Sequence, residues 1–199
     1  MKPRSLLAAF PLFLSLSAGC SMSHGDPKNP KHNPHPVKRY EVIATADAPG
    51  PWDSVKGYLE YKVSNQECTP EDKFLGVHVM PPIVGQDFEM TRIDEKTWKG
   101  YFYRDFMKDE DYYGLGDCHW EPASVSTVFV GNGVAFDPGA VFEKILRNGQ
   151  QTEYFKKSSY GDKALVRYGA QNYSIDDIGV IQNPGDYFKI TMTIKEVGL

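Results

Sequence analysis

An alternation of apolar and polar residues with a period of two is the feature that most constrains the fold of this chain. It is clearest in residues 55–63, where four apolar side chains share one face and three charged side chains share the other: Val55, Leu59, Tyr61 and Val63 against Lys56, Glu60 and Lys62. Residues 187–196 repeat the pattern. Because successive side chains of a β-strand point to opposite faces, the pattern predicts strands that bury one face in a core.

Five further segments favour strands: residues 39–46, 74–80, 88–93, 97–103 and 124–130. Each is rich in β-branched or aromatic residues and is bounded by turn residues, which gives about seven short strands in all. The prediction is therefore a mainly β fold, an antiparallel β-sandwich with one or two helices in its C-terminal third. An α+β arrangement of that third is left open.

Two helices are predicted in the C-terminal third. Residues 137–139 are typical of an N-cap and first turn, apolar residues follow at positions 141, 142, 145 and 146, and Gly149 is a stop signal. A second short helix begins near Ser174 and has Ile175, Ile178 and Ile181 on one side. We expect both helices to pack on or beside the sandwich.

Residues 1–19 are predicted to be an export signal. A basic start is followed by an apolar run over residues 6–16, which is shorter than the ~20 residues that a membrane-spanning helix needs. The end of the segment, Leu16-Ser17-Ala18-Gly19-Cys20, resembles the lipobox of bacterial lipoproteins, although Ser17 stands where a large aliphatic residue is usual. The resemblance implies a lipidated Cys20. With Ser21 next, it implies an outer-membrane anchor and a periplasmic domain. An ordinary cleaved signal peptide is the alternative.

Residues 20–37 are predicted to be a lipidated cysteine and a proline-rich tether, and residues 38–199 a single domain. Between Ser21 and Pro36 lie four prolines and three histidines with almost nothing apolar, so we expect an extended spacer. A metal-scavenging histidine tract is the alternative interpretation.

The three cysteines also bear on the compartment. If Cys20 carries lipid, Cys68 and Cys118 remain, and an even pair in an exported domain predicts a disulfide. Two buried thiols are the alternative. The net charge of −4 and the lack of a basic run argue against a nucleic-acid partner.

Catalytic signatures are scarce in the sequence. It contains no Gly-x-Ser-x-Gly elbow, no phosphate-binding loop and no His-Glu-x-x-His motif. Only His78 and His119 lie in the predicted domain, and neither stands in a pattern that marks a catalytic base. We therefore expect no enzymatic activity, no cofactor and no metal site.

Residues 104–118 form the richest polar segment, with a cluster of carboxylates beside a tyrosine pair: Asp109, Glu110, Asp111, Tyr112 and Tyr113. A calcium loop is one interpretation, because Gly114 is sixth from Asp109, but Trp120 occupies the twelfth position, where an EF-hand has glutamate. A partner-binding loop is the second, since tyrosines supply contact area and carboxylates steer a basic partner. A solvated connection between strands is the third.

Three motifs carry a resemblance to a known family over residues 40–197. They are the opening run 48–57 (Ala-Pro-Gly-Pro-Trp-Asp-Ser-Val-Lys-Gly), the central run 109–120 with Cys118-His119-Trp120, and the closing Asp186-Tyr187-Phe188. They resemble lipoprotein immunity proteins encoded beside type VI secretion phospholipase effectors in Gram-negative bacteria. The resemblance implies a periplasm-facing inhibitor that binds a secreted antibacterial (phospho)lipase, with the acidic-tyrosine loop as a candidate contact surface.

The alternative function is a non-enzymatic envelope lipoprotein that binds carbohydrate or assists envelope assembly. Sugar binding needs several exposed aromatic side chains on one face. The candidates in this sequence are Trp52, Tyr101, Tyr103, Tyr112 and Tyr113.

Overall fold

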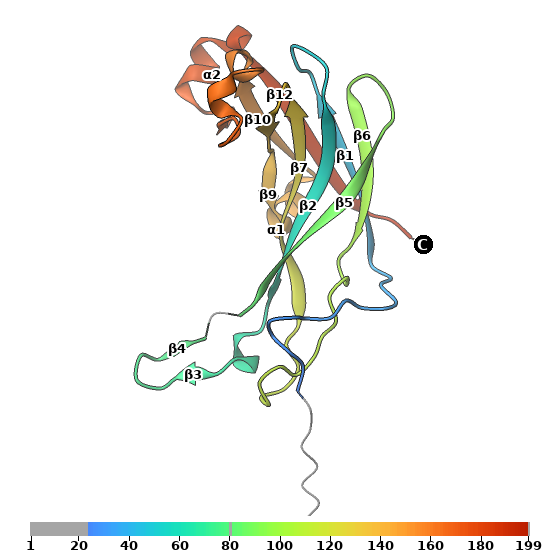
Figure 1. The fold of residues 1–199 in the computed structure, drawn as a ribbon, viewed down its shortest axis with the longest axis vertical. Helices are drawn as coiled ribbons and strands as arrows, with labels where there is room; N and C mark the ends of the chain where they lie inside the picture. Colours follow the sequence, from blue (N-terminus) through green and yellow to red (C-terminus); the bar gives the residue numbers. More distant parts are fainter. Residues whose placement is uncertain (1–23, 80, 199) are drawn as a thin grey trace, which may run out of the picture.

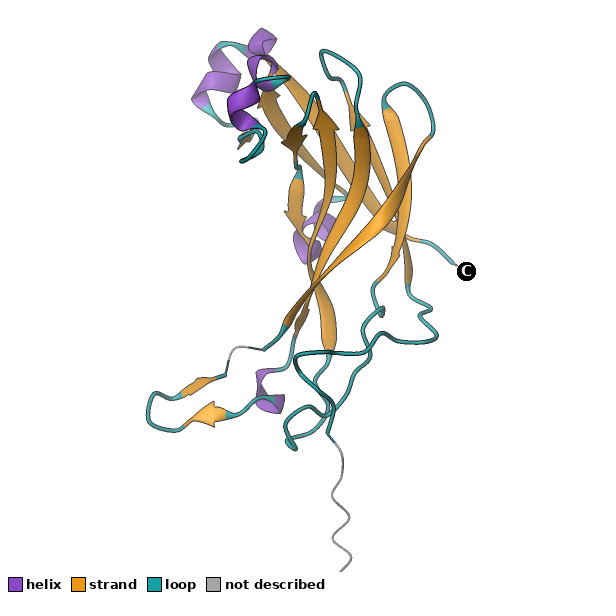
Figure 2. Ribbon diagram, in the orientation of Figure 1, coloured by secondary structure: helices purple, strands orange, loops and turns teal. Residues whose placement is uncertain are grey.

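The computed structural model describes residues 24–79 and 81–198, and these form a mainly β, antiparallel fold as predicted (Figures 1 and 2). One curled sheet has the strand order β11-β10-β12-β1-β6-β5-β2-β7-β8, and β9 pairs with β7. Its strands are β1 Arg39–Ala46, β2 Ser54–Val63, β5 Ile83–Arg92, β6 Thr97–Tyr103, β7 Trp120–Gly131, β8 Val134–Phe136, β9 Gly139–Val141, β10 Gln150–Lys156, β11 Asn172–Tyr173 and β12 Tyr187–Glu196. The sheet curves around its own core and is barrel-like in shape (Figure 1).

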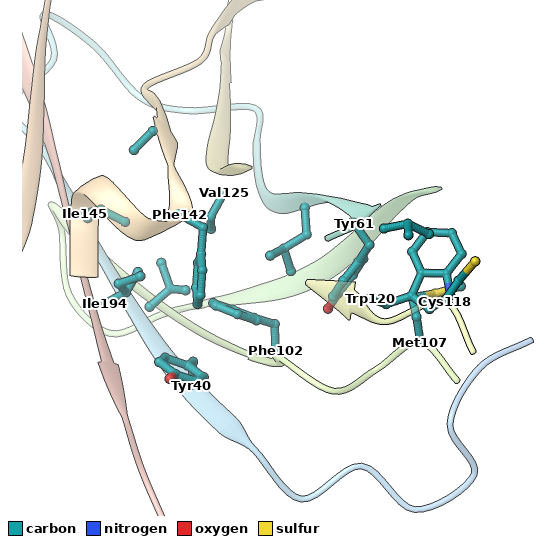
Figure 3. Close-up of a cluster of buried hydrophobic side chains, with 14 of the residues drawn as sticks. Tyr40, Tyr61, Phe102, Met107, Cys118, Trp120, Val125, Phe142, Ile145 and Ile194 are labelled. Atoms are coloured by element: carbon teal, nitrogen blue, oxygen red, sulfur yellow. The ribbon is translucent and has the colours of Figure 1, made fainter. Parts of the chain in front are cut away.

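The predicted alternation fixes which side chains line the core. On β2, Leu59, Tyr61 and Val63 are buried, and on β12 the inward set is Phe188, Ile190, Met192 and Ile194. These side chains divide into two buried clusters. The first cluster includes Tyr40, Tyr61, Phe102, Trp120, Phe142 and Ile145 (Figure 3). The second is mainly aromatic and includes Trp98, Phe129, Phe136, Phe155 and Phe188.

The sheet splits between β5 and β6. Residues Lys56–Lys62 of β2 pair with Ile83–Glu89 of β5, whereas β5 pairs with β6 only at Met90, Thr91 and Arg92. The ring of Phe88 fits beside Gly57, where a Cβ would overlap it. Because β5 pairs with β6 over three residues only, the first half of β5 diverges from β6. A separate hairpin, β3 Glu71–Asp72 and β4 Val77–His78, precedes this half of β5 (Figure 1).

The strand predicted over residues 74–80 is wrong. Residues 73–76 form a turn, and β4 is only Val77–His78. The Asp72 carboxylate accepts hydrogen bonds from the backbone N–H groups of Phe74 (2.9 Å) and Leu75 (3.1 Å), and Gly76 has φ +64°. The carboxylate of Asp72 and the left-handed conformation of Gly76 therefore stabilise a turn in this segment, although its residues favour a strand.

The two helices lie in the C-terminal third. Helix α1, Phe142–Asn148, begins later than predicted because residues 139–141 pair with β7 instead. It ends as predicted at Gly149, whose N–H donates to the carbonyl of Ile145 (2.8 Å). Helix α2, Ile178–Gln182, buries only Val180 and leaves Ile178 and Ile181 exposed, so its predicted apolar side does not pack on the sheet.

Residues 24–36, here called the strap, differ from the expected extended spacer. The strap runs along residues 104–118, called the acidic loop, with backbone hydrogen bonds from Gly25 N–H to Asp111 O (2.8 Å), from Asn33 N–H to Phe106 O (2.7 Å) and from Lys108 N–H to Lys31 O (2.9 Å). The strap has little apolar surface to bury, but the pairing of its backbone groups with the acidic loop orders it.

The predicted export signal and the lipidation of Cys20 lie outside the described residues and stay predictions. Across residues 24–79 and 81–198, no helix combines the length and the apolar character that crossing a bilayer requires.

Candidate functional site

The molecule has two ends that differ in construction (Figures 1 and 2). The strap end comprises the strap, the acidic loop and the β3–β4 hairpin. The helical end lies at the other extreme of the longest axis. It comprises α2, the turns over residues 157–168 and 174–186, and the second buried cluster, against which Tyr160 and Leu165 pack. The strap end contains the residues predicted from the sequence as a contact site.

The predicted disulfide between Cys68 and Cys118 is present and buried, with a Cα–Cα distance of 5.3 Å. Cys68 lies at the base of the β3–β4 hairpin, and Cys118 ends the acidic loop just before β7. The bond therefore joins the two projecting parts of the strap end to each other. Near it, the His78 ring hydrogen-bonds the carbonyl of Thr69 (3.0 Å).

Asp111 organises the tip of the acidic loop. Its Oδ1 accepts hydrogen bonds from the backbone N–H groups of Tyr113 (3.1 Å), Gly114 (2.6 Å) and Leu115 (3.3 Å). Its Oδ2 lies 3.5 Å from Nδ1 of His24 in the strap. Burial alone would raise the pKa of Asp111, but these N–H groups and His24 outweigh burial and hold the pKa below its usual value.

Asp109 joins the acidic loop to the start of β7. Its Oδ1 accepts from the N–H of Trp120 (2.9 Å), and its Oδ2 lies 2.8 Å from Nδ1 of His119. This hydrogen bond raises the pKa of His119. Asp109 and Asp111 thus use oxygens that a calcium loop would need as ligands to bind the chain's own N–H groups.

Glu110 links the acidic loop to the strap. Its Oε1 lies 3.3 Å from both Lys31 Nζ and Lys108 Nζ, and its Oε2 is buried without a hydrogen-bond partner among the described residues. Burial would raise the pKa of Glu110, but the two lysines outweigh it and lower the pKa. Gly25 passes so close to Oε2 that a Cβ there would lie 2.6 Å from it.

The tyrosine pair is turned toward the protein. Tyr112 is only 4% exposed; its hydroxyl accepts from Trp120 Nε1 (3.2 Å) and donates to the carbonyl of Lys108 (3.4 Å). Tyr113 is half-buried against the first core cluster. The structure brings all five predicted contact residues together, but their polar groups mainly hold the acidic loop in shape.

Two of the five aromatic residues predicted to bind sugar, Trp52 and Tyr112, pack into different parts of the core. Trp52 packs against Phe129, Phe136 and Tyr160 in the second cluster, whereas Tyr112 belongs to the first. These two side chains therefore cannot share one exposed platform.

The β3–β4 hairpin carries apolar side chains that sequence reasoning placed in a strand of the sheet. Phe74 is 95% exposed and Leu75 65% exposed, and the neighbouring Val77, Val79 and Ile83 are also exposed. The hairpin projects sideways from the strap end (Figure 1). The spacing of Asp72 and Gly76 is the signal that would have placed Phe74 and Leu75 in a turn.

The helical end carries a second set of exposed apolar side chains. Ile178 is 70% exposed, and Ile175, Ile181, Val166 and Tyr168 are exposed as well. A groove of about 580 Å³ beside α2 is lined by Lys156, Lys157, Ser158, Gly179, Asn183, Asp186 and Tyr187. This end therefore combines apolar contact area with a groove that contains two lysines.

Comparisons with family models, with curated proteins and with solved structures give no match to this chain.

Proposed function

We propose that this protein is a membrane-anchored, non-enzymatic immunity protein that binds a secreted antibacterial (phospho)lipase in the periplasm and blocks it. We further propose that it contacts this partner with its helical end rather than with the acidic loop. The observation that carries the assignment of this surface is the exposure of Ile175, Ile178 and Ile181 in and beside α2.

Exposed isoleucines on a short helix favour a protein contact. Helix α2 turns Val180 into the protein and Ile178 and Ile181 outward. Covering an isoleucine side chain stabilises a complex by up to ~2 kcal/mol before the costs of association are counted. The exposed isoleucines supply apolar contact area and the groove beside α2 supplies polar groups, and protein interfaces combine these two kinds of surface.

The path of the chain also favours the helical end. If Cys20 is lipidated, the strap end is the end held toward the membrane, because the strap begins there at His24. A soluble partner that diffuses through the periplasm then meets the helical end first. The acidic loop is less suited to this role because its carboxylates and Tyr112 are occupied within the chain.

The proposal is tested by inhibition of the secreted lipases encoded near this chain's gene, with purified protein and a fluorogenic phospholipid. We expect stoichiometric inhibition by the wild-type protein and at least a tenfold weaker effect from the Ile178→Asp/Ile181→Asp variant. Val141→Asp is the matched control, because Val141 is also exposed but is the last residue of β9, outside the helical end.

Two results would contradict the proposal in different ways. Wild-type protein that inhibits none of these lipases, or that is retained on a glycan resin instead, contradicts the function. Full inhibition by Ile178→Asp/Ile181→Asp contradicts the contact surface alone.

A further inference from the structure

Most of the predicted spacer between Cys20 and the domain is taken up by the strap, so the remaining connection is short. From Gly25 onward its backbone is hydrogen-bonded to the acidic loop, so it supplies no free length. Only residues 21–23 separate Cys20 from His24. Four Cα–Cα steps of at most ~3.6 Å each cover no more than about 14 Å. A lipid on Cys20 would therefore hold the strap end within about that distance of the bilayer surface.

The β3–β4 hairpin belongs to this same end. Its base is covalently joined to the acidic loop through Cys68 and Cys118, and the acidic loop is in turn joined to the strap through Asp111 and Glu110. The hairpin's turn presents Phe74 and Leu75 to solvent, with Val77 and Val79 following. An apolar turn is thus fixed to the part of the molecule that lies closest to Cys20.

We propose that the β3–β4 hairpin is a membrane-contact element, whose turn inserts Phe74 and Leu75 into the interface of the bilayer that holds the lipid on Cys20. This inference depends on the lipidation of Cys20 and not on the identity of the protein partner. It assigns a role to the most exposed aromatic side chain in the described residues, which the proposed interface at the helical end does not use.

The charges around the turn define the kind of lipid surface. Glu71 and Asp72 precede the turn, and Lys73 lies within it. This acidic balance disfavours a strongly anionic surface and fits a zwitterionic one, such as phosphatidylethanolamine. Lys73 can keep its ammonium group at the headgroups while its stem lies along the apolar turn.

Two apolar side chains bind a bilayer weakly when they act alone. When an anchor already holds the protein at the surface, the second contact becomes intramolecular and acts at an effective concentration in the millimolar range. Stable membrane attachment commonly uses two such signals together. Acyl chains at one point and the hairpin at another would fix the orientation of the domain and direct the helical end away from the membrane.

The test uses the full lipidated chain in vesicles of phosphatidylcholine and phosphatidylethanolamine with brominated acyl chains. Phe74→Trp places a reporter in the turn, and tryptophan suits the interface at least as well as phenylalanine. Ile178→Trp is the matched control at the helical end, and the signal of the native tryptophans is subtracted with wild-type protein. We expect the bromolipids to quench the Phe74→Trp signal at least three times more strongly than the Ile178→Trp signal.

Equal, weak quenching at both positions would overturn the proposal, and so would failure of the chain to float with the vesicles. A third result would overturn it in favour of a protein contact. In that case the reporter of the Phe74→Trp variant would stay accessible to acrylamide on vesicles and become shielded only when the inhibited lipase is added. Inhibition by wild-type protein is measured separately, so failure of the membrane contact does not affect the proposed function.

Discussion

The strap end and the helical end are held together by different forces. At the helical end, aromatic rings of the second cluster pack on one another, with Phe136 in contact with Trp52, Phe155, Tyr160 and Phe188. At the strap end, a disulfide, carboxylate caps and lysine–carboxylate pairs add to the apolar contacts that Met107 and Tyr112 make in the first cluster.

This difference predicts how each end responds to a perturbation. Aromatic packing is indifferent to redox state and nearly so to pH, and its loss affects the whole cooperative unit. A covalent bond and charged hydrogen bonds respond to oxidation state and pH, and their loss opens a local segment first. A disulfide that holds the strap end together persists in an oxidising compartment, which agrees with the proposed location in the periplasm.

The largest expected effect comes from Phe136→Ala at the helical end. Phe136 is fully buried, so its truncation should cost about 3–5 kcal/mol of unfolding free energy through lost burial and a residual cavity. Urea denaturation followed by far-UV circular dichroism measures the loss. Val141→Ala, at an exposed site, is the control and should change little. A loss below about 1 kcal/mol would show that the second cluster can collapse around the cavity.

Removal of the disulfide is the corresponding change at the strap end. The bond spans 50 residues, and the chain-entropy model gives up to about 4 kcal/mol for a loop of this size. For Cys68→Ser/Cys118→Ser we expect amide exchange to rise most in the β3–β4 hairpin and the acidic loop, and least in β8 and β10. Uniform acceleration in both ends would contradict the view that the bond acts locally.

A smaller effect is expected for Tyr112→Phe. The change removes the hydroxyl that Trp120 Nε1 uses and leaves a buried donor unpaired, which should cost about 1–3 kcal/mol. Tyr113→Phe is the matched control, because the described residues supply no hydrogen bond to the Tyr113 hydroxyl. Both variants are compared by urea denaturation. Equal stabilities would show that the Tyr112 hydroxyl does not tie the acidic loop to β7.

Replacing the acidic-tyrosine cluster as a whole would not test a partner contact cleanly. A variant without Asp109, Glu110, Tyr112 and Tyr113 loses the groups that hold the acidic loop to the strap and to Trp120. Weaker inhibition of the lipase by that variant could result from unfolding of the strap end as well as from a lost partner contact. The Ile178→Asp/Ile181→Asp variant avoids this ambiguity because both side chains are already exposed.

The sequence predicted the parts of the fold that depend on local periodicity. The bounds of β1 and β12 match the predicted segments, because alternation over eight to ten residues can be satisfied only by a half-buried strand. Gly149 was predicted as the end of α1 because a left-handed residue stops a helix wherever it occurs. The disulfide followed from the cysteine count.

The rest depends on long-range partners that periodicity does not encode. Residues 139–141 pair with β7 rather than extending α1, and the strap is ordered by backbone groups of a segment about 80 residues away. The isoleucines of α2 have a helical spacing whether they face a core or solvent, so their exposure could not be inferred. The carboxylates at 109–111 were found, but their use as caps within the chain was not.

The smallest expected effect is a pH dependence of the stability of the acidic loop. Its sign differs between the carboxylates of Glu110 and Asp111 and the imidazole of the adjoining His119. Asp111 and Glu110 have lowered pKa values, so their stabilisation is present above the ordinary carboxyl pKa and is lost as the pH falls through the lowered values. His119 has a raised pKa, so its stabilisation is present below the ordinary imidazole pKa and is lost as the pH rises through the raised value.

The acidic loop should therefore be held most firmly between about pH 5 and pH 6, where the carboxylates are ionised and His119 is protonated. Amide exchange of residues 109–118, corrected for intrinsic rates, measures this profile. Asp111→Asn keeps an acceptor oxygen but cannot ionise, so it should flatten the acid limb, and His119→Gln should flatten the alkaline limb. Away from the strap end, acidification is expected to increase stability instead of lowering it. Burial raises the pKa of Asp137 and of Glu153, so their protonation favours the folded state. If amide exchange in the acidic loop and in β10 rose together on acidification, both regions would lose stability with the same pH dependence. That result would contradict the predicted difference between the two ends.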